Sequence, residues 1–169
     1  MALTGRATTT IAAWRAAILS TLASEFAARV QALALCDTYD PEALADDEGN
    51  AVIQTPALLL EIGPSEITTG QPTTLGPRYQ GELIEWRAYH LISSRSADPE
   101  LAAYEMASIT RAILLAQDAK GLTGQRWGLG DAVDRPINLR TQLIELALNG
   151  HHCRVLAWQQ AGLLVETYQ

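Results

Sequence analysis

The densest group of reactive side chains in the sequence is the tripeptide His151-His152-Cys153. A zinc site needs about four ligands at a characteristic spacing, such as two Cys-x-x-Cys pairs. Here Cys36 would have to supply the fourth ligand from a distant part of the chain. Adjacent residues of a strand point to opposite faces, so His152 and Cys153 would not both reach one metal ion without a bulge. We interpret the tripeptide as a turn with exposed histidines and a core cysteine, and we expect no metal and no other cofactor.

Two further combinations could support nucleophilic or acid–base chemistry. His90 and Cys153 could meet across a sheet, but nothing in the sequence marks the orienting group and the oxyanion hole that such a nucleophile needs. Glu61 and Glu85 could form a carboxylate pair on neighbouring strands, but Arg87 lies close enough to neutralise them. A structural ion pair is therefore the interpretation that we favour for these carboxylates.

The usual catalytic motifs are also missing from the sequence. It contains no Gly-x-Ser-x-Gly nucleophile elbow and no Gly-rich loop followed by Lys-Ser/Thr for a phosphate group. The segment Gly128-Leu129-Gly130 lacks the third glycine and the preceding strand of a dinucleotide-binding motif. An enzyme of this size normally leaves some such trace. The sequence therefore predicts no catalytic residues and favours a structural or binding role.

The composition is that of one globular domain, which we expect to span residues 1–169. Hydrophobic residues make up 48% of the 169 residues and the net charge is −7, so the chain can bury a substantial core and is not a disordered chain. The acidity argues against dedicated nucleic-acid binding, which needs clustered Lys and Arg. Two distant cysteines favour a reducing compartment. We recognise no signal peptide and no stretch long enough to span a bilayer.

Most of the negative charge lies in one segment. Residues 37–50 hold six acidic residues and no basic one, which leaves about −1 of the net −7 for the rest of the chain. This composition and the closing Gly49-Asn50 predict a solvated loop. The acidic residues are Asp37, Asp40, Glu42, Asp46, Asp47 and Glu48.

Two segments have the apolar spacing of amphipathic helices. From Ile11 to Leu33, apolar residues recur about every 3.7 residues after threonines that can cap a helix, and Asp37 and Pro41 are expected to end it. Asp98-Pro99-Glu100 is a typical helix start. The apolar spacing that follows continues to Lys120-Gly121, which we expect to end the second helix.

Two strands are expected between these helices. Thr55–Ile62 contains the continuous apolar run Ala57–Leu60, which predicts burial on both faces. Glu82–Ser94 alternates in the manner of a strand with two different faces. One face holds Ile84, Trp86, Ala88 and Ile92, and the other holds Glu85, Arg87 and Tyr89.

The connection between the two strands, residues 63–81, is long and rich in Gly, Pro and Thr. Loops longer than about fifteen residues are uncommon inside compact domains and usually have a function. We interpret this connection as a protruding, β-hairpin-like arm that becomes ordered against a neighbouring subunit. The alternative is a flexible surface loop. The candidate interface side chains of the arm are Ile67, Leu75, Arg78 and Tyr79.

Two features of the C-terminal half leave alternatives open. Trp127 lies in the turn-rich segment 121–138, where it either plugs an edge of the core or anchors an interface, and it joins the candidate interface residues. Residues 139–148 fit either a helix capped by Asn149-Gly150 or a strand that enters an Asn-Gly hairpin. We favour the hairpin, because the residues after the turn alternate like a strand that needs a partner.

The predicted fold class is α+β: a mixed or antiparallel sheet packed by two amphipathic helices, with the long β-hairpin-like arm. This order of elements resembles the tail terminator, or tail completion, proteins of tailed bacteriophages and of phage-like contractile particles. The resemblance covers most of the chain and rests on pattern and element order. The segments that carry it are Ile11–Leu33, Thr55–Ile62, Glu85–Tyr89, Asp98–Gly121 and Val155–Gln160.

The resemblance implies a structural virion protein without an active site. Its copies would form a homohexameric ring that caps the head-proximal end of the tail tube, ends tube polymerisation and joins the tail to the neck. The implied partners are further copies of the chain, the tail tube protein, the neck or connector protein and, in a contractile tail, the sheath protein. The ring would be assembled in the bacterial host cytoplasm, with DNA as passing cargo and no membrane partner. Alternatives are a neck or head–tail joining protein and, in a different class, a small soluble adaptor or binding domain.

Two surfaces would matter in such a ring. Head-to-tail association needs two different patches on each subunit, and the arm is our candidate for one of them, with a strand edge of the neighbour as its acceptor. A hexamer would carry six times −7, a charge of −42. If the acidic loops faced the lumen they would repel DNA, and if they faced outward they would keep the ring soluble. The sequence leaves both placements open.

Overall fold

The computed structural model describes residues 8–40, 53–67, 79–118, 120–143 and 150–165. The elements in chain order are α1 (Ile11–Arg29), β1 (Leu35–Thr38), β2 (Ala57–Ile67), β3 (Tyr79–Ser93), α2 (Pro99–Leu114), the short 3-10 helix η1 (Gly130–Ala132), β4 (Ile137–Leu143) and β5 (His151–Val165). The strands form one five-stranded sheet in the order β1-β2-β3-β5-β4, in which β1 and β2 are parallel and the other neighbours antiparallel. This is the α+β fold, with a mixed sheet and two helices, that the sequence predicts.

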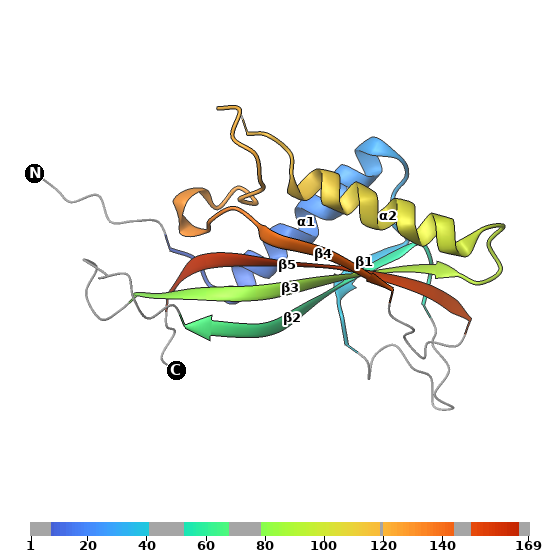
Figure 1. The fold of residues 1–169 in the computed structure, drawn as a ribbon, viewed down its shortest axis with the longest axis horizontal. Helices are drawn as coiled ribbons and strands as arrows, with labels where there is room; N and C mark the ends of the chain where they lie inside the picture. The colour runs from blue at the N-terminus through green and yellow to red at the C-terminus, as the bar shows by residue number, and fades with distance from the viewer. Residues whose placement is uncertain (1–7, 41–52, 68–78, 119, 144–149, 166–169) are drawn as a thin grey trace, which may run out of the picture.

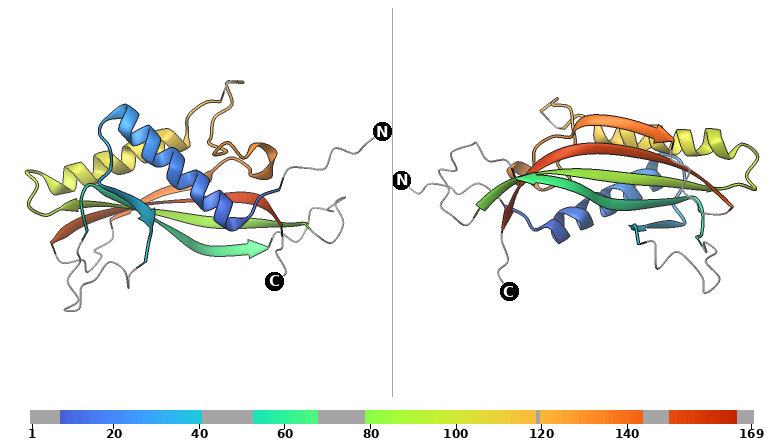
Figure 2. Two further views of the ribbon diagram at one scale, coloured as in Figure 1. Left: turned by 180° about the vertical axis from the view of Figure 1, so that it is seen from behind. Right: turned by 60° about the horizontal axis from the view of Figure 1, so that its bottom comes forward.

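Both helices cover the same face of the sheet (Figures 1 and 2). The stripe that α1 buries recurs every four residues, as the helical spacing requires, and consists of Trp14, Ile18, Leu22 and Phe26. Trp86 of β3 and Trp158 of β5 lie in the same layer, and both are fully buried. The main core is therefore the layer between the two helices and the sheet.

The start of α1 is as predicted, but its predicted end at Leu33 is wrong. The hydroxyl of Thr10 caps the helix by accepting a hydrogen bond from the amide of Ala13 at 3.1 Å. The helix ends at Arg29, and residues 35–38 form β1, which pairs with the first residues of β2. Asp37, predicted to lie in a loop, is therefore part of an edge strand. So short a strand has no periodic signal of its own, and its pairing with β2 specifies it.

The predicted start of α2 is confirmed, and its predicted end is also too late. The Asp98 carboxylate accepts a hydrogen bond from the amide of Leu101 at 3.0 Å. The helix ends at Leu114 because the chain turns back on itself there. The carbonyl of Leu114 accepts a hydrogen bond from the amide of Gln125 at 2.9 Å, so a later segment takes up a carbonyl that another helical turn would have used.

β2 and β3 are both longer than the sequence predicts. Ala57 to Leu60 are all 0% exposed, which confirms burial on both faces of β2. β2 then continues through an irregularity between Ile62 and Ser65 as far as Ile67, and β3 already begins at Tyr79. The described part of the expected arm is thus a continuation of the β2–β3 pair. Residues 68–78 lie outside the described residues.

The hairpin alternative for the C-terminal segment is confirmed as far as the structure describes it. β4 is a strand that pairs antiparallel with β5, from Ile137 opposite Gln159 to Leu143 opposite Arg154. Residues 144–149 lie outside the described residues. The helix alternative for 139–143 is therefore wrong, because these residues satisfy their backbone groups through β5.

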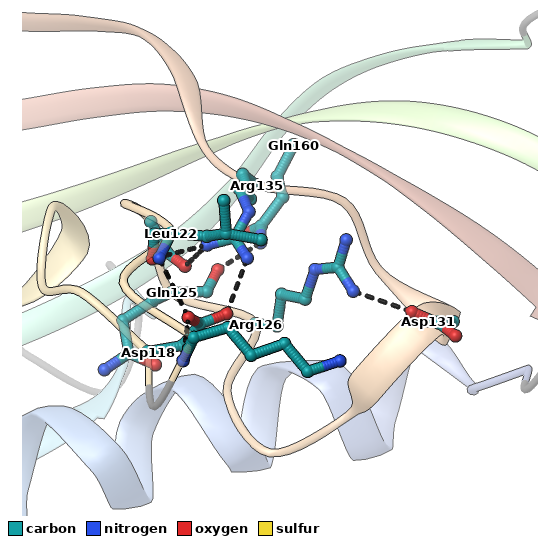
Figure 3. A network of polar contacts seen from close by, with 9 residues as sticks. Asp118, Leu122, Gln125, Arg126, Asp131, Arg135 and Gln160 are labelled. Atoms are coloured by element: carbon teal, nitrogen blue, oxygen red, sulfur yellow. Dashed lines mark hydrogen bonds and ion pairs between the residues drawn. The ribbon is translucent and has the colours of Figure 1, made fainter.

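A buried glutamine of β5 holds the segment between α2 and β4. Gln160 is 0% exposed, and its Oε1 accepts a hydrogen bond from Trp127 Nε1 at 2.8 Å. Its Nε2 donates to the carbonyl of Gln125 at 2.9 Å (Figure 3) and to the carbonyl of Asp134 at 2.6 Å. Trp127 is 4% exposed and has a φ of 56°, a conformation rare for a non-glycine residue. It plugs an edge of the core, and it has almost no side-chain surface left for a neighbouring subunit.

A more exposed polar network closes the same segment (Figure 3). Arg135 donates to the Asp118 carboxylate at 2.7 Å and to the carbonyls of Leu122 and Gly124, both at 2.9 Å. Asp118 also accepts hydrogen bonds from the amides of Leu122 and Lys120. The Arg135 hydrogen bond first, and the Leu122 amide next, lower the pKa of Asp118 to about 2. The Asp118 carboxylate therefore stays charged at neutral pH, where its ion pair with Arg135 closes the turn.

α1 approaches the sheet most closely at Gly162 of β5. A Cβ atom at this position would lie 2.4 Å from Cζ3 of Trp14, well inside van der Waals contact. Trp14 also packs edge to face against Trp86, with ring centroids 5.2 Å apart. The missing side chain of Gly162 therefore lets the Trp14 ring lie directly on the backbone of β5.

Replacing this glycine tests the contact. We expect Gly162→Ala to lower the free energy of unfolding by about 1–3 kcal/mol, the usual cost of overpacking a core. In a Trp14→Phe background the same substitution should cost less, because the smaller ring leaves room for the methyl group. Chemical denaturation of the wild-type chain, the two single variants and the double variant measures the difference. Gln159→Ala serves as a control on the same strand. Equal costs in both backgrounds would contradict the close contact.

Candidate functional site

The face of the sheet opposite the helices, here called the open face, carries a row of charged side chains. This charged row consists of Glu61 from β2, Glu85 and Arg87 from β3, and Arg140 from β4. Arg87 lies 2.8 Å from Glu85 and 3.4 Å from Glu61, and Arg140 lies 2.5 Å from Glu85. The hydroxyl of Tyr89 donates a hydrogen bond to Glu61 at 2.5 Å. The predicted ion pairing of Arg87 with both carboxylates is thus confirmed.

The register of the sheet brings the row together. Glu61 lies opposite Arg87, Arg87 opposite Ala157, and Ala157 opposite Arg140. Because the side chain of Ala157 is short, Arg140 can reach across β5 to Glu85 on β3. Sequence reasoning missed Arg140, since it could not decide whether this residue lies in a helix or in a strand.

Glu85 is the centre of the row and is only 7% exposed. Burial acts to raise the pKa of its carboxyl group, but the hydrogen bonds and charges of Arg87 and Arg140 outweigh burial, and the pKa is lowered. The hydrogen bond with Glu85 is also the main reason why the pKa of Arg87 is raised. Glu85 and Arg87 therefore stay charged at neutral pH. The row balances two carboxylates with two guanidinium groups.

His90 and Cys153 do not form a nucleophilic pair. The register places Cys153 opposite Leu91 and Arg154 opposite His90, so His90 points toward the helices and Cys153 toward the open face. His90 Nδ1 lies 3.0 Å from the carbonyl of Arg154, and Nε2 lies 2.7 Å from the hydroxyl of Thr110. A carbonyl oxygen only accepts, so Nδ1 donates to it and the hydroxyl of Thr110 donates to Nε2. His90 thus ties β3 to α2 as a neutral imidazole.

The titration of these groups also fits a structural role. Burial lowers the pKa of His90 to about 4. Burial raises the pKa of Cys153 to about 12 and that of Cys36 to about 11, whereas a reactive cysteine has a lowered pKa. Among the described residues, no group of three or more His, Cys, Asp or Glu side chains is placed to hold a metal ion.

An apolar groove of about 230 Å³ lies on the helical side, between the C-terminal end of α1 and α2. Its apolar lining includes Phe26, Val30, Leu33, Ile92, Met106 and Ile109. Val30 is 63% exposed, an unusual position for a valine that adjoins a core. The groove is therefore a candidate binding surface, which the sequence did not indicate because its residues follow the ordinary spacing of two core-facing helices.

The structure describes only part of the predicted interface set. Ile67 and Tyr79 are the last residue of β2 and the first residue of β3, where the arm begins. Leu75 and Arg78 lie outside the described residues.

The predicted acidic loop is also described only in part. Asp37 and Asp40 are exposed, and the Asp37 carboxylate accepts a hydrogen bond from the amide of Thr38 at 2.7 Å. The other four acidic residues lie outside the described residues, namely Glu42, Asp46, Asp47 and Glu48.

Comparison with known proteins gives no family. No protein-family model matches the sequence, and no curated protein matches it either. Within the described ranges, no helix combines the length and the apolar character needed to cross a membrane. Any function proposed for the chain therefore rests on the order of its elements and on the surfaces described above.

The charged row makes a prediction about stability. Glu85→Gln should lower the free energy of unfolding by about 1–2 kcal/mol at neutral pH, because it leaves two partly exposed arginines without their shared carboxylate. The pKa of Glu85 is lowered from 4.5, so its contribution is present above this pH and is lost as the pH falls below it. The deficit of the variant, measured by denaturation, should therefore shrink in acid. A deficit that does not change with pH, or an equal one in Glu66→Gln at the exposed end of β2, would contradict this role.

His90 gives a second dependence of stability on pH. Its pKa falls from the ordinary value of 6.5 to about 4 in the folded chain, so between these two values the unfolded chain binds the proton more readily. The contribution is complete above pH 6.5 and decreases as the pH falls toward 4, with a loss of about 2 kcal/mol by pH 5. Denaturation curves between pH 7.5 and 5 should show a smaller dependence on pH in His90→Gln and an unchanged one in His152→Gln. The same dependence in both variants would refute the assignment.

Proposed function

We propose that this chain is a structural subunit of a phage-type tail: a tail terminator whose copies form a ring on the head-proximal end of the tail tube. In this role the ring stops polymerisation of the tube and joins the tail to the neck or connector. The proposal rests on the resemblance of the element order to that of tail terminator proteins. It also rests on the difference between the two ends of the sheet, one with an extended strand pair and the other with an apolar groove.

The observation that carries the proposal is the extension of the β2–β3 pair at one end of the sheet (Figure 1). Residues 64–66 of β2 are exposed, although Ser65 and Glu66 remain paired with β3. A paired but exposed strand end is an element that a neighbouring subunit can cover. At the other end of the sheet lies the apolar groove. Head-to-tail association of identical subunits needs two such different patches.

The polar groups with shifted pKa values support a role without catalysis. His90 and Glu85 each have structural partners, Cys153 is buried and Cys36 is half-buried. Catalytic sites instead gather shifted groups in one cleft. The proposed work of the chain is association with further copies, with the tube protein, with the neck protein and, in a contractile tail, with the sheath. DNA passes through the ring as cargo.

Electron microscopy of particles from which this gene has been deleted tests the proposal. We expect tail tubes that are overlong and variable in length, because nothing ends their polymerisation. The intact chain should restore the normal length when it is supplied again. A chain in which a short Gly-Ser linker replaces residues 68–78 should not restore it. Tubes of normal length without attached heads would point to the neck-protein alternative, and normal particles would exclude both roles.

A further inference from the structure

The groove between α1 and α2 has the composition of a docking site for an aliphatic side chain with a cation beside it. Most of the lining is apolar, and Val30 exposes 63% of its surface there. The lining also includes Glu105 of α2, an exposed carboxylate. A partner that supplies both an aliphatic group and a positive charge would match the groove in both respects.

The segment of this chain that carries such a pair lies at the opposite end of the sheet. Residues 68–78 join Ile67 at the end of β2 to Tyr79 at the start of β3, and they contain Leu75 and Arg78 but no acidic residue. Leu75 is the only large aliphatic residue of that segment and Arg78 its only charged one.

This segment cannot reach the groove of its own chain. Ile92 lines the groove and lies thirteen residues along β3 from Tyr79, which is about 43 Å at ~3.3 Å per strand residue. The other end of the connection, Ile67, lies opposite Glu82, which is ten residues from Ile92, or about 33 Å at ~3.3 Å per strand residue. A connection of eleven residues with both ends fixed on neighbouring strands extends from them by about half its contour, about 20 Å at ~3.5 Å per residue. Contact between the two is therefore possible only between different copies.

We propose that the groove receives residues 68–78, the central part of the arm, from a second copy of this chain. Leu75 enters the apolar groove near Val30, and Arg78 pairs with Glu105. This assignment rests on the proposed ring and names the acceptor within it: the helical face rather than a strand edge. Each subunit gives its arm at one end and receives an arm at the other, so the contact runs head to tail and links successive subunits.

Cross-linking between two singly substituted proteins tests the contact directly. Leu75→Cys protein is mixed with Val30→Cys protein, and a short bismaleimide is added. Ser20→Cys, an exposed position of α1 outside the groove, replaces Val30→Cys in the matched control. We expect a heterodimeric adduct that is at least several-fold more abundant with Val30→Cys than with Ser20→Cys.

A charge reversal tests the same contact without new cysteines. Arg78→Glu and Glu105→Arg should each weaken self-association about tenfold, since a close opposite pair becomes a like pair. The double variant should regain most of the loss, as measured by sedimentation. The proposal is overturned by adduct no more abundant than with Ser20→Cys, by a double variant no better than the single ones, or by a wild-type chain that stays monomeric at every soluble concentration.

These outcomes are separate from those of the proposed function. Overlong tubes after deletion of the gene, without the Leu75–Val30 adduct, would leave the terminator proposal standing and overturn the groove as acceptor. The adduct together with normal tubes would support the groove and overturn the terminator.

Discussion

The pairing of β3 with β5 determines which side chains lie on each face of the sheet. The two strands are 15 residues long and pair along their whole length, from Tyr79 opposite Val165 to Ser93 opposite His151. Because side chains alternate along a strand, this single register sorts every residue of both strands onto one face or the other. Trp86 and Trp158 fall beneath the helices, and Arg87 and Ala157 fall on the open face. A slip by one residue would exchange the tryptophan layer with the charged row.

The same pairing explains how three polar side chains of β3 and β5 find their partners. From β3, His90 reaches Thr110 of α2, and from β5, Gln160 reaches the segment that follows α2. On the other face, Glu85 gathers arginines from two strands. A buried polar group costs free energy unless it finds partners, and these three groups find them on different elements. They fix how the helices, the segment after α2 and β4 sit on the central strand pair.

The sequence predicted those parts of the fold whose signal is local. The caps at Thr10 and Asp98, the two-sided burial of Ala57–Leu60 and the two faces of β3 follow from spacing and residue type, and all are confirmed. The ends of both helices were placed too late. They depend on contacts with distant segments, such as the hydrogen bond from Gln125 to Leu114, and apolar spacing alone does not contain this information.

The candidate surfaces also divide into features with a local sequence signal and features that depend on contacts between distant segments. The pairing of Arg87 with Glu61 and Glu85 could be predicted because all three lie on strands with clear patterns, whereas Arg140 joins them only through the register of β4. The groove could not be predicted, since it arises from the space between two helices that each look ordinary. Trp127 shows the limit of residue type as a guide to interfaces, because a buried hydrogen bond to Gln160 places it in the core.

The order of the elements and the two unlike ends of the molecule lead to one central proposal, that the chain works by associating with copies of itself into a closed ring. Native mass spectrometry of the intact chain, recorded over its soluble concentration range, tests this claim most directly. We expect a single discrete oligomer at six times the mass of the chain, with no ladder of larger species, because a ring closes and leaves no free ends. A chain that remains monomeric throughout, or that grows into open-ended polymers, would contradict it.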